Sequence, residues 1–494
     1  MYDPGVKIFY YLCNKIRYEN DKIWTKREQA AASVFIPTMI NDSKSKRWTT
    51  LFMVSFIMMM GYVFWDVVSP LSTTLKAPIA EGGMGWTSAE YGFFAGSYSI
   101  FNIFLLMLFF GGIILDKTGI RFTGILATGL MLGGAAVNWY AINAISPLVQ
   151  AETGFTLFGL IPQPVKLQVL VSSLGFGLFG VGCDITGITI SKIVTKWFTG
   201  YELASAMGIQ VSMARLGTAS AISFSPVIAE VAGLSAPFLV GTILLLIGFV
   251  TFLAYTLMDK KFDKEREALR QEVKKEEEDN FSFRDFMTVL RNPGFWLIAF
   301  LCVFFYSSIR PFLKFASDLL VHKYMISEVT AGWIVSLLPY GTIVLTPFFG
   351  NLYDRIGKGA TLMLIGCTLV TVCHLCLALP IIQQTWFASI IMILLGVSFS
   401  LVPSAMWPSV PKIVPLKQLG TAYSIIYYVQ NIGLMLVPMW IGNLIGDYTA
   451  ADGKVDFTVP MLVFMLFGVI SILIAFALKF MDGKKQYGLE NHKR

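Results

Sequence analysis

Twelve long apolar runs follow one another along the chain, separated by short polar stretches. A helix needs about 20 predominantly apolar residues to cross a hydrocarbon core of roughly 30 Å. Six runs lie near 48–71, 91–115, 120–143, 167–196, 203–231 and 234–258, and six more near 292–321, 328–352, 359–381, 385–413, 418–446 and 458–481. The pattern predicts an all-α membrane protein with twelve transmembrane helices.

One long charged block separates the sixth run from the seventh. We therefore expect an N-terminal extension (1–47), a six-helix bundle (48–258), a charged and partly helical linker (259–290), a second six-helix bundle (291–481) and a tail (482–494). Lys and Arg crowd the extension, the linker, the tail and the turns after the second and eighth runs. Since cytoplasmic loops carry an excess of basic residues, this asymmetry predicts that both termini are cytoplasmic.

The composition supports a membrane protein and excludes several functions. The 494 residues are 55% hydrophobic and 14% charged, whereas soluble domains are about 25% charged. The net charge of +7 is explained by basic cytoplasmic loops rather than by binding of nucleic acid. There is no Walker motif, and His322, His374 and His492 stand apart in the sequence. We expect no ATP hydrolysis, no catalytic residues, no cofactor and no metal site.

An internal repeat links the two halves. The segments "GIILDKTGIR" (112–121) and "GNLYDRIGKG" (350–359) share the frame Gly-x-x-x-Asp-[Lys/Arg]-x-Gly. Each follows the second span of its half, where glycine allows neighbouring helices to approach closely. Two copies at equivalent places indicate a duplicated six-helix unit.

With this repeat, residues 48–481 resemble the major facilitator superfamily. The resemblance implies two six-helix bundles around a central cavity, with alternating access of that cavity to the two sides of the membrane. It also implies that the repeat is a cytoplasmic gate formed by Gly112, Asp116, Lys117, Arg121, Gly350, Asp354 and Arg355.

Two opposite charges lie inside apolar runs on either side of one short turn. Asp184 precedes the turn "KWFTGYEL", and Arg215 follows it by a similar number of residues. In an antiparallel hairpin that rises about 1.5 Å per residue, both reach a depth of roughly 20 Å. Charges at that depth face the protein interior or a wet cavity. They are either a buried ion pair that locks two helices or a clamp for the two ends of a zwitterion.

Three stretches are similar to the superfamily branch that contains the lysosomal dipeptide transporter, namely "GYVFWDVVSPL", "KWFTGYELASAMGIQVSMARLGTA" and "MWPSVPKIVPLKQLGTAYSIIYYVQNIGL". In that branch an acid in the fourth span and an arginine in the fifth contact a dipeptide, which implies these roles for Asp184 and Arg215. Arg310 and Lys314 depart from the branch and would favour an anionic substrate. Asp66 is a candidate for binding substrate or a proton, or for pairing with Arg310. The remaining candidate cavity residues are Trp407, Tyr423, Tyr427 and Asn431.

The resulting hypothesis is a secondary transporter of small peptides or amino-acid-like zwitterions. The alternatives are a transporter of organic anions or sugar phosphates, and a non-transporting membrane sensor. We expect a small-molecule substrate, contact with the lipid bilayer, no nucleic-acid partner and a monomer. Both Asn-x-Ser/Thr sites, at Asn41 and Asn280, fall on the predicted cytoplasmic side, and no dileucine-type signal is found. This favours a bacterial plasma membrane over a lysosomal one.

Overall fold

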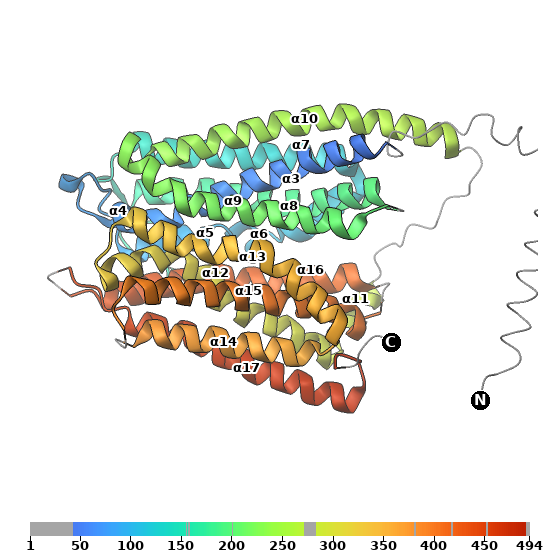
Figure 1. Cartoon of the computed structure of the whole chain (residues 1–494). Helices are drawn as coiled ribbons and strands as arrows, with labels where there is room; N and C mark the ends of the chain where they lie inside the picture. Colours follow the sequence, from blue (N-terminus) through green and yellow to red (C-terminus); the bar gives the residue numbers. More distant parts are fainter. Residues whose placement is uncertain are drawn as a thin grey trace, which may run out of the picture.

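The computed structural model describes residues 43–490 apart from 155, 157–158, 200, 271–282, 380–381, 416–417 and 451–452. Most of the predicted extension 1–47 and the middle of the predicted linker 259–290 therefore lie outside the described residues. The described chain is almost entirely helical, and the helices lie roughly parallel in two groups (Figure 1). The N-terminal half comprises α3 to α10, and the C-terminal half comprises α12 to α17.

The N-terminal half contains one small two-stranded hairpin. Its strands β1 (Gln150–Ala151) and β2 (Val165–Lys166) pair antiparallel between α7 and α8. Its helices are α3 (Lys44–Asp66), η2 (Ser69–Leu71), α4 (Ser72–Lys76), η3 (Ile79–Glu81), α5 (Ser88–Ser97), α6 (Ile100–Phe104), α7 (Met107–Ala144), α8 (Leu167–Phe198), α9 (Leu203–Ala232) and α10 (Ala236–Arg270).

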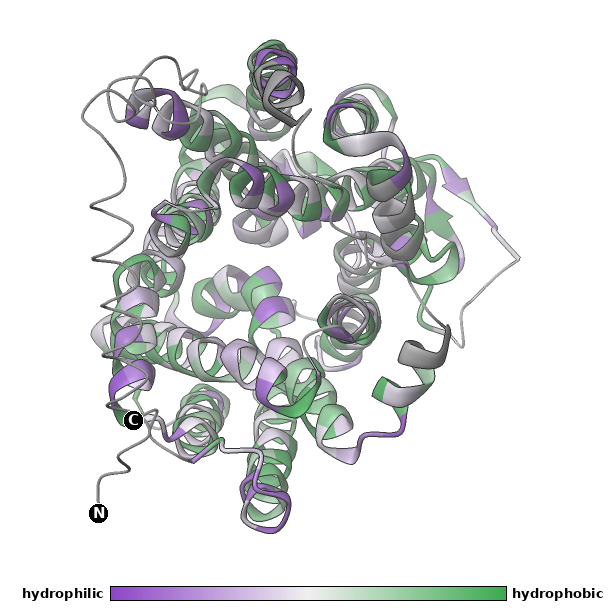
Figure 2. Ribbon diagram, turned by 90° about the vertical axis from the view of Figure 1, so that its right-hand side faces the viewer, coloured by the Kyte–Doolittle hydropathy of each residue, from purple (hydrophilic) through white to green (hydrophobic). Residues whose placement is uncertain are grey.

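A short helix, α11 (Phe283–Leu290), leads into the C-terminal half. The long helices of that half are α12 (Pro293–Tyr324), α13 (Glu328–Ile356), α14 (Gly359–Ala378), α15 (Thr385–Ile413), α16 (Leu419–Asp447) and α17 (Thr458–Lys485). Figure 2 shows the helices viewed roughly along their axes. We call the end that carries the α8–α9 turn and α11 the linker end, and the opposite end, which carries α4, the α4 end.

Ten helices within the described ranges are long and apolar enough to cross a membrane. The predicted spans 91–115 and 203–231 are not among the ten. The first is broken, because α5, α6 and the start of α7 are separate helices and Leu106 has a φ of 51°. The second is the single helix α9, which is long enough but carries Arg215 among many small and hydroxyl-bearing residues. A single continuous helix over 91–115 was therefore a wrong expectation.

The repeated motif has the same backbone feature in both copies. Its last glycine has a positive φ, 80° at Gly119 and 70° at Gly357. Gly119 turns the chain within α7, and Gly357 ends α13. A side chain at either position would be strained, so the glycine of the frame is required for the turn itself.

The two halves are in close contact near the α4 end. The Thr73 hydroxyl and the Lys76 ammonium both donate to Asp318 of α12. Glu328 of α13 accepts from the backbone N–H and the hydroxyl of Thr74. At the crossing of α5 with α16, a Cβ built on Gly442 would lie 2.7 Å from the Cα of Gly92. The structure is therefore a conformation that is closed at the α4 end.

We expect Gly442→Val to destabilise this closed conformation without unfolding the helices. The added side chain would also clash with the Ser88 carbonyl, which lies 2.5 Å from the ideal Cβ position. Opening can be measured as faster maleimide labelling of Ser72→Cys, a buried position in α4, in a cysteine-free background. Gly446→Val is the matched control because its Cβ would meet nothing within 4 Å. Equal labelling in both variants would contradict the predicted role of this crossing.

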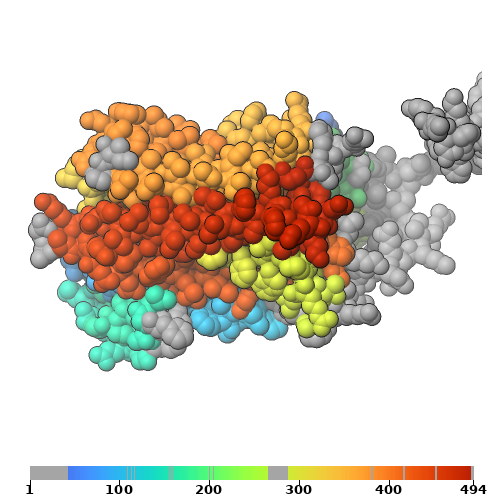
Figure 3. Space-filling model, turned by 90° about the horizontal axis from the view of Figure 1, so that it is seen from below, coloured from blue at the N-terminus to red at the C-terminus, as the bar shows by residue number. Residues whose placement is uncertain are grey.

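The last described residues are packed into the C-terminal half at the linker end. Leu489 is fully buried, and its carbonyl accepts from the backbone N–H of Gly359. The Glu490 carboxylate accepts from the backbone N–H and hydroxyl of Thr361, in the first turn of α14. Asp482 in α17 accepts from the backbone N–H groups of both Leu489 and Glu490. The segment thus ties α17 to the start of α14, its neighbour along the face shown in Figure 3.

Leu489→Ala is expected to destabilise the protein by about 2–5 kcal/mol, the usual cost of truncating a buried leucine. The measurement is the thermal unfolding midpoint of the detergent-solubilised full chain. Lys485→Ala, at an exposed position at the end of α17, is the control and should leave the midpoint unchanged. An unchanged midpoint in Leu489→Ala would show that the segment is not docked.

Candidate functional site

Asp184 lies on α8, where that helix packs against the break in the second span. A Cβ on Gly180 would lie 2.1 Å from the Tyr98 carbonyl oxygen, so glycine is needed for this close approach. The approach lets the Tyr98 hydroxyl donate to Asp184 Oδ1 at 2.7 Å and Asn102 Nδ2 donate to Oδ2 at 2.6 Å. Asn431 of α16 adds a longer bond, 3.5 Å from its Nδ2 to Oδ2. Irregular backbone of this kind is tolerated at membrane depth where it is buried in protein.

Arg215 lies on α9 and points across to the other half. Its guanidinium carbon lies 4.5 Å from the centre of the Phe399 ring, which belongs to α15. Among the described residues it forms no ion pair with Asp184, whose oxygens are occupied by Tyr98, Asn102 and Asn431. The sequence-based alternative of a buried Asp184–Arg215 ion pair is therefore wrong for this conformation. The two charges belong to adjacent helices but face different neighbours.

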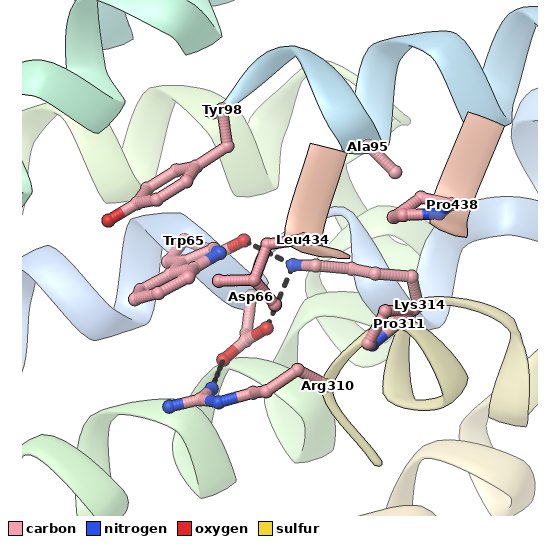
Figure 4. Close-up of a pocket in the computed structure, with 9 residues that line it drawn as sticks. All are labelled: Trp65, Asp66, Ala95, Tyr98, Arg310, Pro311, Lys314, Leu434 and Pro438. Carbon is pink, nitrogen blue, oxygen red and sulfur yellow. Dashed lines mark hydrogen bonds and ion pairs between the residues drawn. The ribbon is translucent and has the colours of Figure 1, made fainter. Parts of the chain in front are cut away.

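Asp66 ends α3 and is held by two cations of α12. Lys314 Nζ donates to Asp66 Oδ1 at 2.8 Å and to the Trp65 carbonyl at 2.7 Å. Arg310 approaches the other oxygen, Oδ2, at 3.7 Å (Figure 4). All three charged side chains are at least nine-tenths buried. Of the three roles considered for Asp66 from the sequence, the structure shows the pairing with Arg310, and it adds a closer contact with Lys314.

A small pocket adjoins this cluster. Its volume is about 20 Å³, and its lining includes Trp65, Asp66, Tyr98, Arg310 and Lys314, which Figure 4 shows converging from different helices. Such a space has room for about one water molecule. In this conformation the space beside Asp66 is therefore too small for a peptide.

The remaining candidate residues form a connected set on α15 and α16. Trp407 and Tyr427 are stacked with ring centres 5.1 Å apart, and Tyr423 lies 5.8 Å from the same indole. Trp407 Nε1 donates to the Tyr306 hydroxyl at 3.3 Å. One helical turn beyond Tyr427, Asn431 reaches Asp184 and also accepts from the Ser99 hydroxyl at 2.6 Å. The three aromatic residues therefore lie nearer the linker end than Asn431. Of these four candidates, Asn431 is the one that contacts a charged candidate, Asp184.

The predicted gating residues do not join the two halves in this conformation. Arg121 pairs with Asp259 and Asp263 of α10, within its own half. Arg355 donates to Asn351 on its own helix, and Asp354 and Lys117 are exposed. A Cβ on Gly112 or Gly350 would meet nothing within 4 Å, so the close helix approach expected there is absent here. The side chain of Asp116 lies outside the described part of the structure.

Sequence reasoning missed Tyr98, Asn102 and Phe399, which contact the two charges directly. Asn102 could have been found, since a lone amide inside the apolar run "SIFNIF" is rarely left without a role. Phe399 carries no comparable signal among the 40 phenylalanines of the chain. His322, which was expected to stand alone, in fact contacts Asp318, with 3.2 Å between Nδ1 and Oδ1. No group of side chains suited to a metal ion occurs among the described residues.

Fold and site together are those of a helical membrane transporter. A family model described as Major Facilitator Superfamily matches residues 153–319 and 312–493. The chain therefore belongs to the major facilitator superfamily, as the repeat and the charge pattern had suggested.

Individual relatives of known function indicate one branch of the superfamily. The lysosomal dipeptide transporter MFSD1 of Homo sapiens is 26% identical over 435 residues, which cover 85% of this chain and 84% of that protein. MFSD1 of Gallus gallus is 28% identical over 311 residues, covering 59% of this chain and 67% of that protein. The resemblance to this branch is thus confirmed.

Solved structures show the same fold. A variant of the nucleoside transporter NupG has a TM-score of 0.64 at 15% identity, covering 87% of this chain and 99% of that one. A peptide transporter, POT, in complex with sulfate has a TM-score of 0.62 at 12% identity, covering 94% of this chain and 99% of that one.

The chain is accordingly a multi-pass membrane transporter of a small solute and not an enzyme. The expectation of a bacterial plasma membrane finds no support, because the curated MFSD1 relatives are vertebrate lysosomal proteins.

Proposed function

We propose that this chain moves small peptides or amino-acid-like zwitterions across a membrane by alternating access. The observation that carries the proposal is the separation of Asp184 and Arg215. A half-buried carboxylate held by neutral donors and a guanidinium held against a ring can each take an opposite charge from a ligand. The dipeptide transport named for MFSD1 supports the same substrate class.

In this proposal Asp184 receives the ammonium group of the ligand and Arg215 its carboxylate. Asn431, Trp407, Tyr423 and Tyr427 form the wall of the binding cavity on the C-terminal half. The binding of a ligand between helices of the two halves, near the midplane, is the usual arrangement in secondary transporters.

The proposed topology has twelve crossings. The broken segment formed by α5, α6 and the start of α7 completes one of them, and α9 completes another. Both termini and the linker 259–290 are cytoplasmic, so the linker end faces the cytoplasm. The structure is then closed on the opposite side, and Asp116, Lys117, Asp354 and Arg355 act when the cytoplasmic side closes. We expect the monomer to be the transporting unit.

Uptake into proteoliposomes tests the proposal. Labelled dialanine is expected to accumulate in vesicles that contain the protein and not in empty vesicles, whereas labelled hexose phosphate should not be taken up. Uptake of hexose phosphate without dialanine would replace the peptide hypothesis by the organic-anion alternative. Uptake of neither, in protein shown to be folded, would favour a non-transporting sensor.

A further inference from the structure

A second guanidinium stands beside the proposed carboxylate site. Arg310 of α12 lies 5.6 Å from the centre of the Phe399 ring, the ring that Arg215 contacts from the other half. The guanidinium carbon of Arg310 also lies 4.9 Å from the centre of the Trp65 ring and 5.5 Å from that of Tyr62. Two like charges from opposite halves therefore converge on one ring, which is unfavourable unless an anion binds between them.

None of the hydrogen bonds found among the described residues comes from the Arg310 guanidinium. A guanidinium has five N–H donors, and Arg310 is only 8% exposed. Its approach to Asp66 Oδ2, at 3.7 Å, is too long for a hydrogen bond, and that oxygen has no hydrogen-bond partner among the described residues. Lys314 already holds the other oxygen of Asp66 at 2.8 Å. Arg310 can therefore serve a ligand while Asp66 keeps its counterion.

The balance of charges around this cluster also favours an anionic ligand. Arg215, Arg310 and Lys314 are three cations, and among the described residues Asp66 and Asp184 are the two carboxylates that lie beside them. A neutral zwitterion would leave this excess of one positive charge unchanged. A ligand with a net charge of −1 would remove it, and unbalanced buried charge is costly within a membrane.

We propose that Arg310 binds the side-chain carboxylate of the substrate, so that the transporter prefers dipeptides with an acidic side chain. This inference rests on the proposed peptide transport. Asp184 binds the ammonium group, Arg215 the terminal carboxylate, and Arg310 the second carboxylate. Arg310 is thereby a specificity-determining residue, whereas Lys314 holds Asp66.

The test compares two isosteric peptides. Unlabelled Ala-Glu and Ala-Gln compete with labelled dialanine for uptake by the full-length protein in proteoliposomes. Ala-Glu is expected to inhibit at about tenfold lower concentration than Ala-Gln, the effect of one charge-assisted bidentate contact. In Arg310→Gln the two peptides should inhibit equally, and Arg310→Lys should retain part of the difference. Arg291→Gln, at an exposed arginine, is the matched control and should keep the full ratio.

Thermal stabilisation of the solubilised protein by each peptide gives a second measurement if Arg310→Gln transports poorly. Equal inhibition by Ala-Glu and Ala-Gln in the unchanged protein, with normal dialanine uptake, would overturn the acidic preference and leave peptide transport intact. A tenfold ratio that persists in Arg310→Gln would assign the preference to another residue and also overturn the inference. Failure of every dipeptide to enter or bind would overturn both proposals together.

Discussion

Dipeptide uptake is expected to fall by about 100-fold in Asp184→Asn and in Arg215→Gln, and to stay low when both changes are combined. Each change removes the partner of one charged end of the ligand, and the loss of a buried charged contact commonly costs 2 kcal/mol or more. The measurement is initial-rate uptake of labelled dialanine by proteoliposomes with equal amounts of folded protein.

The free energy of unfolding of the variants distinguishes a ligand clamp from an ion pair between Asp184 and Arg215. Because Asp184 and Arg215 have different neighbours, their effects on the free energy of unfolding should add to within about 0.5 kcal/mol. Blocked peptides provide the chemical control. Acetylating the amine should abolish competition with dialanine through loss of the contact with Asp184, and amidating the carboxylate should do so through Arg215. Near-normal uptake by the double variant would refute the clamp.

Asp66→Ala is expected to lower the free energy of unfolding by about 3–5 kcal/mol, because it leaves two buried cations of α12 without their anion. Lys314→Met should cost less, since Arg310 still faces the carboxylate. The double variant Asp66→Ala with Lys314→Met should recover much of the loss. Thermal unfolding of the four proteins measures the coupling between the two positions.

The outcome also bears on the closed conformation. Asp66 and Lys314 belong to opposite halves, and Lys314 is further fixed by its bond to the Trp65 carbonyl. Asp66→Ala should therefore open the α4 end and speed the labelling of Ser72→Cys. Additive effects of the two substitutions on stability, with unchanged labelling, would mean that this contact does not hold the halves together.

The fold was largely predictable because lipid imposes a simple rule on sequence. Runs that must cross about 30 Å of hydrocarbon have to be apolar and helical, so most predicted spans match observed helices within a few residues, as for 385–413 and α15. The second span was the exception. Its break near Tyr98 and Leu106 depends on packing against α8 and α16. The hydropathy of a segment does not show which helices it will contact, so the break could not be predicted from the apolar pattern.

The charged residues of the centre were also recognisable, since charge inside an apolar run is costly and rarely without a role. Their partners were not recognisable. Equal depth on adjacent helices suggested that Asp184 would meet Arg215, but the rotation of each helix places Asp184 toward α5 and α6 and Arg215 toward Phe399. A shift of a few tens of degrees about a helix axis changes the partner without changing the depth.

By itself, the sequence determined the apolar runs, the duplicated turn with its obligatory glycines, and the few charges that had to be accommodated at membrane depth. These follow from local properties, namely transfer of side chains into lipid and the backbone freedom of glycine at Gly119 and Gly357. The tertiary structure alone decided which half supplies each partner, placing Lys314 on Asp66 and both Arg215 and Arg310 on Phe399. Such pairings depend on how whole helices pack across the interface between the halves. There, residues far apart in the chain come within hydrogen-bonding distance, as do Asp66 and Lys314, which are 248 positions apart.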